Sequence, residues 1–149
     1  MLRLTDKQKL DLVITAVSLL GVRYKYGAEV DLNVEPENVM EIDCSELVEF
    51  CYRKIGYIVP DGACNQFEAS EPVALPILYP EVGDLAFMRR IESGKISHVG
   101  LYVGRDKIIH ASGFHNEVVI TPLSEFQKKT KYSEFAGIRR FLEDKVKNA

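Results

Sequence analysis

Residues 98–112 read HVGLYVGRDKIIHAS, and this stretch decides the fold. Its first half alternates, so that three apolar residues face one side of an extended strand and His98, Gly100 and Tyr102 face the other. The Gly-Arg-Asp turn at 104–106 predicts a tight hairpin, which brings residues 98–102 beside residues 108–112. We therefore expect His110 to lie near His98. Because Gly100 has no side chain, another segment can approach there, and we expect the start of the helix that carries Cys44 to pack on this face.

Further segments of strand character surround the hairpin and lie in the second half of the chain. The candidate strands are Asp84–Met88, His98–Val103, Lys107–Ala111, Val118–Thr121 and Gly137–Phe141. Helical patterns occupy the first half. This order predicts an α+β fold, with N-terminal helices packed on a central antiparallel sheet of about five strands. No repeat or linker divides the chain, so residues 1–149 are expected to form a single domain.

Two helices are predicted in the first half. Thr5 followed by Gln8 is a capping-box pattern, and apolar positions with helical spacing follow it: Leu10, Val13, Ile14, Val17 and Leu20. The second helix starts after Asp43, an N-cap residue with Glu46 three positions later. This register makes Cys44 the first residue of the helix. The apolar face of the helix comprises Leu47, Val48, Cys51, Tyr52 and Ile55.

Two segments lack a regular pattern. Residues Ala28–Glu41 carry several acidic side chains and no basic one, and Pro36 interrupts them, which predicts an exposed loop. Residues Pro60–Pro80 contain four prolines and are expected to form a long connection.

The composition is that of a globular protein of 149 residues, 46% hydrophobic and 28% charged. Its net charge is −3, from 19 Lys and Arg against 22 Asp and Glu, which argues against nucleic acid as the main partner. The longest mostly apolar run, Val13–Val22, is too short to span a bilayer, so no membrane insertion is expected. The start of the chain lacks the pattern of a signal peptide, which predicts synthesis in the cytoplasm.

The three cysteines, Cys44, Cys51 and Cys64, are an odd number without a close pair, which disfavours a disulfide framework. Cys51 belongs to the apolar face of its helix, and Cys64 has no evident partner. Cys44 differs, because free N–H groups at a helix N-terminus stabilise a thiolate, lower its pKa and can hold an oxyanion. With His98 as base and His110 orienting the base, these residues could perform nucleophilic catalysis.

Several short motifs occur in a fixed order along the chain. Residues 42–48, IDCSELV, resemble the Asp-Cys-Ser-Gly-hydrophobic motif of the NlpC family of cell-wall cysteine peptidases. Residues 98–104 and 109–112 are similar to the two histidine strands of that family, and residues 21–27 to its Tyr-x-x-Gly element. Gly83-Asp84-Leu85 and Arg139-Arg140 match the opening and closing strands of the family's sheet. The resemblance spans nearly the whole chain.

The resemblance implies a circularly permuted papain-like fold with a Cys-His-His triad. Cys44 would be the nucleophile, His98 the general base and acid, and His110 the orienting residue. The implied activity is that of a cysteine endopeptidase on a peptidoglycan stem peptide or muropeptide, cutting between γ-D-glutamate and a diamino acid without a metal or other cofactor. Such an enzyme would reach the cell wall after phage-type release or through a secretion system.

The resemblance also implies a substrate-binding set. Tyr24 would lie beside the nucleophile and help to hold the substrate carbonyl. Asp43 and Ser45 would line the subsite for the amino-terminal part of the stem peptide.

The chain departs from the family pattern near the nucleophile. Glu46 stands where the family usually has glycine, and Ala28 stands where a second glycine is common. Asp61-Gly62 replaces an Arg-Ser pair that often touches substrate in the family. These departures leave two alternatives open: an amidase, deamidase or acyltransferase acting on another substrate, and a non-catalytic binding module. A zinc site built from Cys44 and the three histidines is disfavoured, because the ligands lack paired short spacing.

Overall fold

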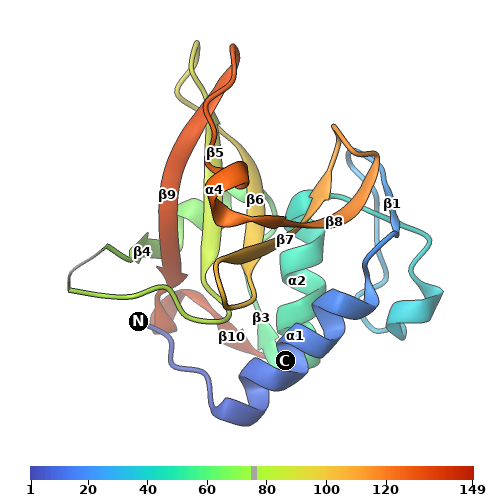
Figure 1. Ribbon diagram of the computed structural model, residues 1–149. Helices are drawn as coiled ribbons and strands as arrows, with labels where there is room; N and C mark the ends of the chain where they lie inside the picture. The colour runs from blue at the N-terminus through green and yellow to red at the C-terminus, as the bar shows by residue number, and fades with distance from the viewer. Residues whose placement is uncertain (75–76) are drawn as a thin grey trace.

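The computed structural model describes residues 1–74 and 77–149 (Figure 1). Its helices are α1 (Asp6–Ser18), α2 (Cys44–Lys54), α3 (Ala63–Glu68) and α4 (Leu123–Phe126), with short 3-10 turns η1 (Pro36–Asn38) and η2 (Glu143–Lys145). Its strands are β1 (Arg23–Tyr24), β2 (Glu41–Ile42), β3 (Tyr57–Ile58), β4 (Ser70–Pro72), β5 (Leu85–Arg90), β6 (Ile96–Tyr102), β7 (Lys107–Ser112), β8 (Glu117–Pro122), β9 (Ser133–Phe141) and β10 (Lys147–Asn148).

The main sheet has eight strands in the order β2-β1-β8-β7-β6-β5-β9-β4, and β10 pairs with β3 separately. The α+β fold and all five predicted strands, β5 to β9, are confirmed. The expected strand number was too small, because β1, β2 and β4 are two or three residues long and carry no readable alternation. The sheet is also not purely antiparallel, since β1 and β2 are parallel.

The β6–β7 hairpin has the predicted register. Leu101 pairs with Ile109 and Tyr102 with Ile108, and the turn residues Arg105 and Asp106 have positive φ. The ladder between the two strands consists of these two pairs. Residues 98–100 and 110–112 therefore continue beyond the paired region.

The two faces of the sheet carry separate clusters of buried residues. Val99 and Leu101 belong to the larger cluster, together with buried residues of α1 and α2. Gly100 faces the smaller cluster, where a Cβ atom would lie 2.4 Å from Ile108 Cγ2 and 3.0 Å from Phe126 Cε2. The prediction that the Cys44 helix packs beside Gly100 is therefore wrong. Glycine is required there by Ile108 and by Phe126 of α4, and α2 packs on the opposite face.

Helix α1 forms as predicted but buries a different face. Thr5 Oγ1 accepts from the Gln8 N–H at 3.1 Å and Gln8 Oε1 accepts from the Thr5 N–H at 2.9 Å, which completes the capping box. The buried residues are Leu12, Thr15, Ala16 and the C-cap Leu19. Leu10 and Ile14, from the predicted apolar face, are 60% and 54% exposed. The helix is apolar on more than one side, so spacing alone did not identify the side that the core covers.

The segment 60–80, expected to be a connection, contains α3 and β4. Leu75 and Pro76, which belong to the same predicted connection, lie outside the described residues. Across the part of the chain that the structure describes, no helix is both long enough and apolar enough to cross a membrane.

A buried ion pair and a hydrogen bond hold β9 and α2 against the two residues that precede β5. Arg140 Nε donates to Asp84 Oδ1 at 2.7 Å, and Arg140 Nη2 donates to Asp84 Oδ2 at 2.9 Å. The Tyr52 hydroxyl of α2 donates to the Gly83 carbonyl at 2.5 Å. The Gly-Asp motif at 83–84 is thus explained by its partners on α2 and β9, which hold the helix that begins at Cys44 against the sheet.

Candidate active site

The N-terminus of α2 is held by a complete capping box. Asp43 Oδ1 accepts from the Glu46 N–H at 2.9 Å and from the Ser45 hydroxyl at 3.2 Å, and Glu46 Oε1 accepts from the Asp43 N–H at 3.3 Å. The sequence-predicted register is confirmed: Cys44 is the first residue of the helix. Its thiol therefore lies at the end of α2 where backbone N–H groups lack intrahelical acceptors.

Cys44 is half-buried beside the point where the β6–β7 ladder ends. Burial raises the pKa of its thiol to about 11, although the backbone N–H groups of Val99, Ser45 and Cys44 itself favour the thiolate. The expected low thiol pKa is therefore wrong for the free protein. Desolvation outweighs the helix terminus, and the nearby Asp43 carboxylate further disfavours a second negative charge.

His98 and His110 lie close together, as the hairpin predicts, and their rings are joined by a hydrogen bond. His98 Nε2 and His110 Nδ1 are 2.8 Å apart, and His110 Nε2 lies 3.2 Å from Thr121 Oγ1. Phe126 of α4 stacks on the His98 ring and meets the His110 ring edge-on, with centroid separations of 5.7 and 5.0 Å. Burial lowers the pKa of His98 to about 4 and, together with the charges of His98 and His115, that of His110 to about 3. Both imidazoles are neutral at pH 7.

The thiol and the histidine pair pack against different clusters of buried residues. The Cys44 side chain packs against the larger cluster, which contains buried residues of α2, whereas both imidazoles pack on Phe126 of α4. Among the described residues, no hydrogen bond joins the Cys44 thiol to either imidazole. Because His98 Nε2 is occupied by His110, Nδ1 is the ring nitrogen left for the thiol.

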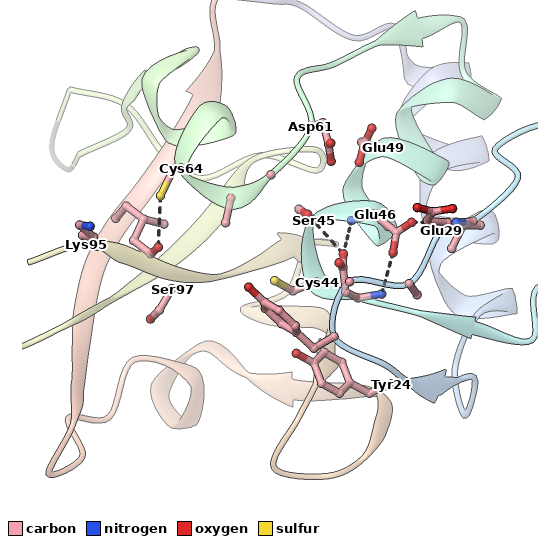
Figure 2. Close-up of a pocket in the computed structure, with 18 of the residues that line it drawn as sticks. Tyr24, Glu29, Cys44, Ser45, Glu46, Glu49, Asp61, Cys64, Lys95 and Ser97 are labelled. Carbon is pink, nitrogen blue, oxygen red and sulfur yellow. Dashed lines mark hydrogen bonds between the residues drawn. The ribbon is translucent and has the colours of Figure 1, made fainter. Parts of the chain in front are cut away.

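Cys44 opens into a cavity of about 810 Å³ (Figure 2). The cavity is lined by the loop 26–30, the first turns of α2, the segment 61–64 and the tip of the β5–β6 hairpin. The three predicted substrate-binding residues are brought together there: Tyr24, Asp43 and Ser45 all line the cavity with Cys44. His98 and His110 are not among its lining residues.

The Tyr24 ring is held against the chain beyond β7. A Cβ atom on Gly113 would lie 3.2 Å from Tyr24 Cε1, so the ring packs directly on that glycine. Burial and the charges of Cys44 and Asp43 raise the pKa of the Tyr24 hydroxyl. The phenol therefore stays protonated and can donate a hydrogen bond inside the cavity.

Carboxyl groups dominate the α2 side of the cavity. Glu46 Oε2 accepts from the Val30 N–H at 2.8 Å, and burial raises the pKa of Glu46 to about 7. Burial and the neighbouring Asp61 raise the pKa of Glu49 to about 8. Glu29 also lines this side. A group that carries positive charge is favoured here, because it stabilises carboxylates that otherwise resist ionisation.

Cys51 and His115 do not line this cavity, whereas Cys64 lines it from α3. Cys51 is fully buried in the core, as predicted. Cys64 is exposed on α3, and its thiol donates to the Ile96 carbonyl at 3.4 Å. His115 is in an exposed loop, with Nδ1 3.0 Å from the Ser112 hydroxyl. In the described ranges 1–74 and 77–149, no three His, Cys, Asp or Glu side chains gather as a metal site would require.

Sequence reasoning missed several residues of the site. Thr121 and Phe126 support the histidines from β8 and α4, and only the register of β7 with β8 could have indicated Thr121. Arg90, Ser93 and Lys95 reach the cavity from a hairpin tip that no motif marked.

A family model and several known proteins match this chain. Residues 21–137 match the model of the NlpC/P60 family. The chain is 31% identical over 132 residues to a gamma-D-glutamyl-L-lysine dipeptidyl-peptidase of Bacillus subtilis, covering 87% of this chain and 40% of that protein. It is 36% identical over 107 residues to the murein DD-endopeptidase MepH of Escherichia coli, covering 70% of this chain and 38% of that protein.

A solved structure agrees with these matches. The peptidoglycan hydrolase RipB of Mycobacterium tuberculosis superposes with a TM-score of 0.65 at 26% identity, covering 92% of this chain and 66% of that one. The chain spans about a quarter to a half of the length of the curated relatives that it matches. The family model covers most of the chain, from the Tyr24 element through both histidine strands, and the chain therefore belongs to the NlpC/P60 family.

Proposed function

We propose that this chain is a cysteine endopeptidase that hydrolyses amide bonds in peptidoglycan stem peptides, at the bond between γ-D-glutamate and a diamino acid. The observation that carries the proposal is Cys44 at the N-terminus of α2, where it opens into a cavity, together with the hydrogen-bonded pair of His98 and His110. Relatives named for peptidoglycan or γ-glutamyl hydrolysis support the substrate class.

The resting state has a neutral thiol and a neutral imidazole, because the pKa of Cys44 is raised and that of His98 is lowered. The thiol proton therefore moves as the sulfur attacks, and not before. Catalytic hydrogen bonds are often long in free enzymes and shorten when substrate binds, so His98 Nδ1 meets the thiol in the substrate complex.

In the first half-reaction, Cys44 Sγ bonds to the amide carbonyl carbon and His98 Nδ1 takes the thiol proton. The N–H groups of Cys44 and Ser45 and the Tyr24 hydroxyl stabilise the oxyanion. Cleavage of the C–N bond follows, and the leaving amine takes the proton from His98. The product is a thioester of Cys44 and the free amine of the diamino acid.

In the second half-reaction, a water molecule gives a proton to His98 Nδ1 and its oxygen attacks the thioester carbon. Cleavage of the C–S bond returns the proton to sulfur and releases a carboxylic acid. Asp43 and Ser45 line the part of the cavity that would hold the amino-terminal residues of the peptide. The carboxyl groups of Glu29 and Glu49 favour the free ammonium of such a peptide, because the ammonium stabilises their ionised form.

Mass spectrometry of muropeptides incubated with the purified protein tests this function. The wild type and a Cys64→Ala variant should release a fragment that ends in γ-D-glutamate, and a folded Cys44→Ala variant should release none. Cys64 is the matched control, because it lines the same cavity and is exposed. If folded wild-type protein leaves the muropeptides unchanged, the proposal is overturned, and another acyl substrate or a binding role is favoured.

A further inference from the structure

The tip of the β5–β6 hairpin places two cations opposite each other at the cavity. The Arg90 N–H donates to the Lys95 carbonyl at 2.8 Å, so the two residues face each other across the end of the hairpin. Both side chains line the cavity, as does that of Ser93 in the turn between them. Like charges directly opposite each other in an antiparallel pair are destabilising.

Neighbouring groups do not neutralise these two cations. Arg89, one position earlier, is 3.8 Å from a Glu134 carboxylate oxygen. For Arg90 and Lys95, no ion pair is formed within residues 1–74 and 77–149. Glu92, the acidic residue of the turn, is not among the residues that line the cavity. An anion that enters the cavity would reduce the repulsion between these two exposed cations.

Lys95 lies on the side of Cys44 that faces away from Glu29 and Glu46. Figure 2 shows Cys44 between Lys95 and Ser97 on one side and Glu29 and Glu46 on the other. The cavity is thus polarised along one axis, with the nucleophile near its middle. A peptide that has positive charge at one end and negative charge at the other fits this axis in one direction.

We propose that Arg90, Ser93 and Lys95 form a carboxylate subsite for the part of the substrate that leaves as the amine. The proposal rests on the proposed function, which assigns the carboxylate-rich side to the amino-terminal part of the peptide. The preferred substrate then carries a free carboxylate close to the scissile bond on the leaving side. Short stem peptides with a free C-terminus meet this requirement better than peptides whose C-terminus is extended or amidated.

The polarity also rejects the reversed orientation. A peptide bound backwards would bring its ammonium group to Arg90 and Lys95 and its carboxylate to Glu29. Both ends would then face like charge, which costs binding free energy. The two cations therefore select the direction of the peptide as well as its terminal group.

Binding to a Cys44→Ala variant tests the subsite without turnover. The probes are L-alanyl-γ-D-glutamyl-L-lysine with a free C-terminal carboxylate and the same tripeptide with a C-terminal amide, measured by titration calorimetry. We expect the carboxylate form to bind about three- to tenfold more tightly at low salt, as two solvent-accessible ion pairs allow. The preference should shrink when the ionic strength rises to about 0.5 M, because salt screens exposed charges.

Two double variants in the same background make the comparison specific. Arg90→Gln with Lys95→Gln should bring the affinity ratio close to one by weakening the carboxylate form alone. Arg105→Gln with Lys107→Gln removes the same charge from the exposed β6–β7 turn and should leave the ratio unchanged.

Equal affinities for the two probes, absence of binding of either, or a ratio that survives the Arg90 and Lys95 substitutions would each overturn the subsite. Turnover of the carboxylate tripeptide by the wild type is measured in parallel. Its absence counts against the proposed hydrolysis, whereas the binding ratio alone decides the subsite.

Discussion

Thr121 should control the tautomer of His98, the proposed base, although two hydrogen bonds separate it from that ring. His98 must present an unprotonated Nδ1 to Cys44, so its ring proton is on Nε2 and is donated to His110 Nδ1 across 2.8 Å. The His110 proton is then on Nε2 and is donated to Thr121 Oγ1 across 3.2 Å. The chain of donors ends at the hydroxyl of Thr121, a residue that is buried.

Thr121→Val keeps the shape of the side chain and removes this acceptor. His110 can then move its proton to Nδ1, which would force the His98 proton to Nδ1 and block the base. The loss of one hydrogen bond of about 1 kcal/mol predicts a kcat about fivefold lower, with a range of about two- to tenfold. Thr121→Ser should restore kcat, because the hydroxyl returns.

The assay is kcat on the muropeptide at pH 7, together with ¹⁵N NMR of labelled histidines. The NMR signature should move from one His110 tautomer towards a mixture in Thr121→Val and not in Thr121→Ser. A wild-type kcat in Thr121→Val would refute the relay. Equal loss in the valine and serine variants would refute it as well, since packing and not the acceptor would then be responsible.

Two further predictions concern pH and the core. Because burial holds the pKa of His98 at about 4, kcat/KM should decrease on the acid side near pH 4 and not near pH 6.5. The neutral ring also contributes stability to the fold above pH 6.5, and this contribution is lost as the pH falls through 4. An acid limb at 6 to 7 in the pH profile would show that the free enzyme solvates this imidazole. Leu12→Ala, at a fully buried position of α1, should cost about 2–5 kcal/mol in urea unfolding, whereas Leu10→Ala, 60% exposed, should cost under about 1 kcal/mol. Similar losses in both variants would contradict the observed orientation of α1.

Local patterns predicted the site better than they predicted the packing around it. The N-cap at Asp43 and the turn at 104–106 are decided by residues close in sequence, so the positions of Cys44, His98 and His110 followed from spacing. The face of α1 is decided by the rest of the molecule. Leu12, Ala16 and Leu19 have the same helical spacing as the predicted apolar face that includes Leu10 and Ile14. Only burial in the folded protein distinguishes the two sets.

Gly100 was misinterpreted for a related reason. Its missing side chain correctly indicated a close approach, but the sequence does not say which segment approaches. Ile108 on the adjacent strand and Phe126 on α4 are the neighbours, and α4 is four residues long. A helix of that length has no periodic signal, and neither do the short strands at the sheet edge.

Glu46, which stands where the family usually has glycine, contacts the acidic segment 28–41. Most of this side chain is buried at the start of α2, where a carboxylate without partners would be costly. One oxygen accepts from the Asp43 N–H and the other from the Val30 N–H, so the carboxylate closes the helix cap and ties down the acidic segment. Residues 28–30 become a wall of the cavity through this contact. A glycine in this position could make neither contact, which gives a physical reason for the glutamate and the acidic segment to occur together.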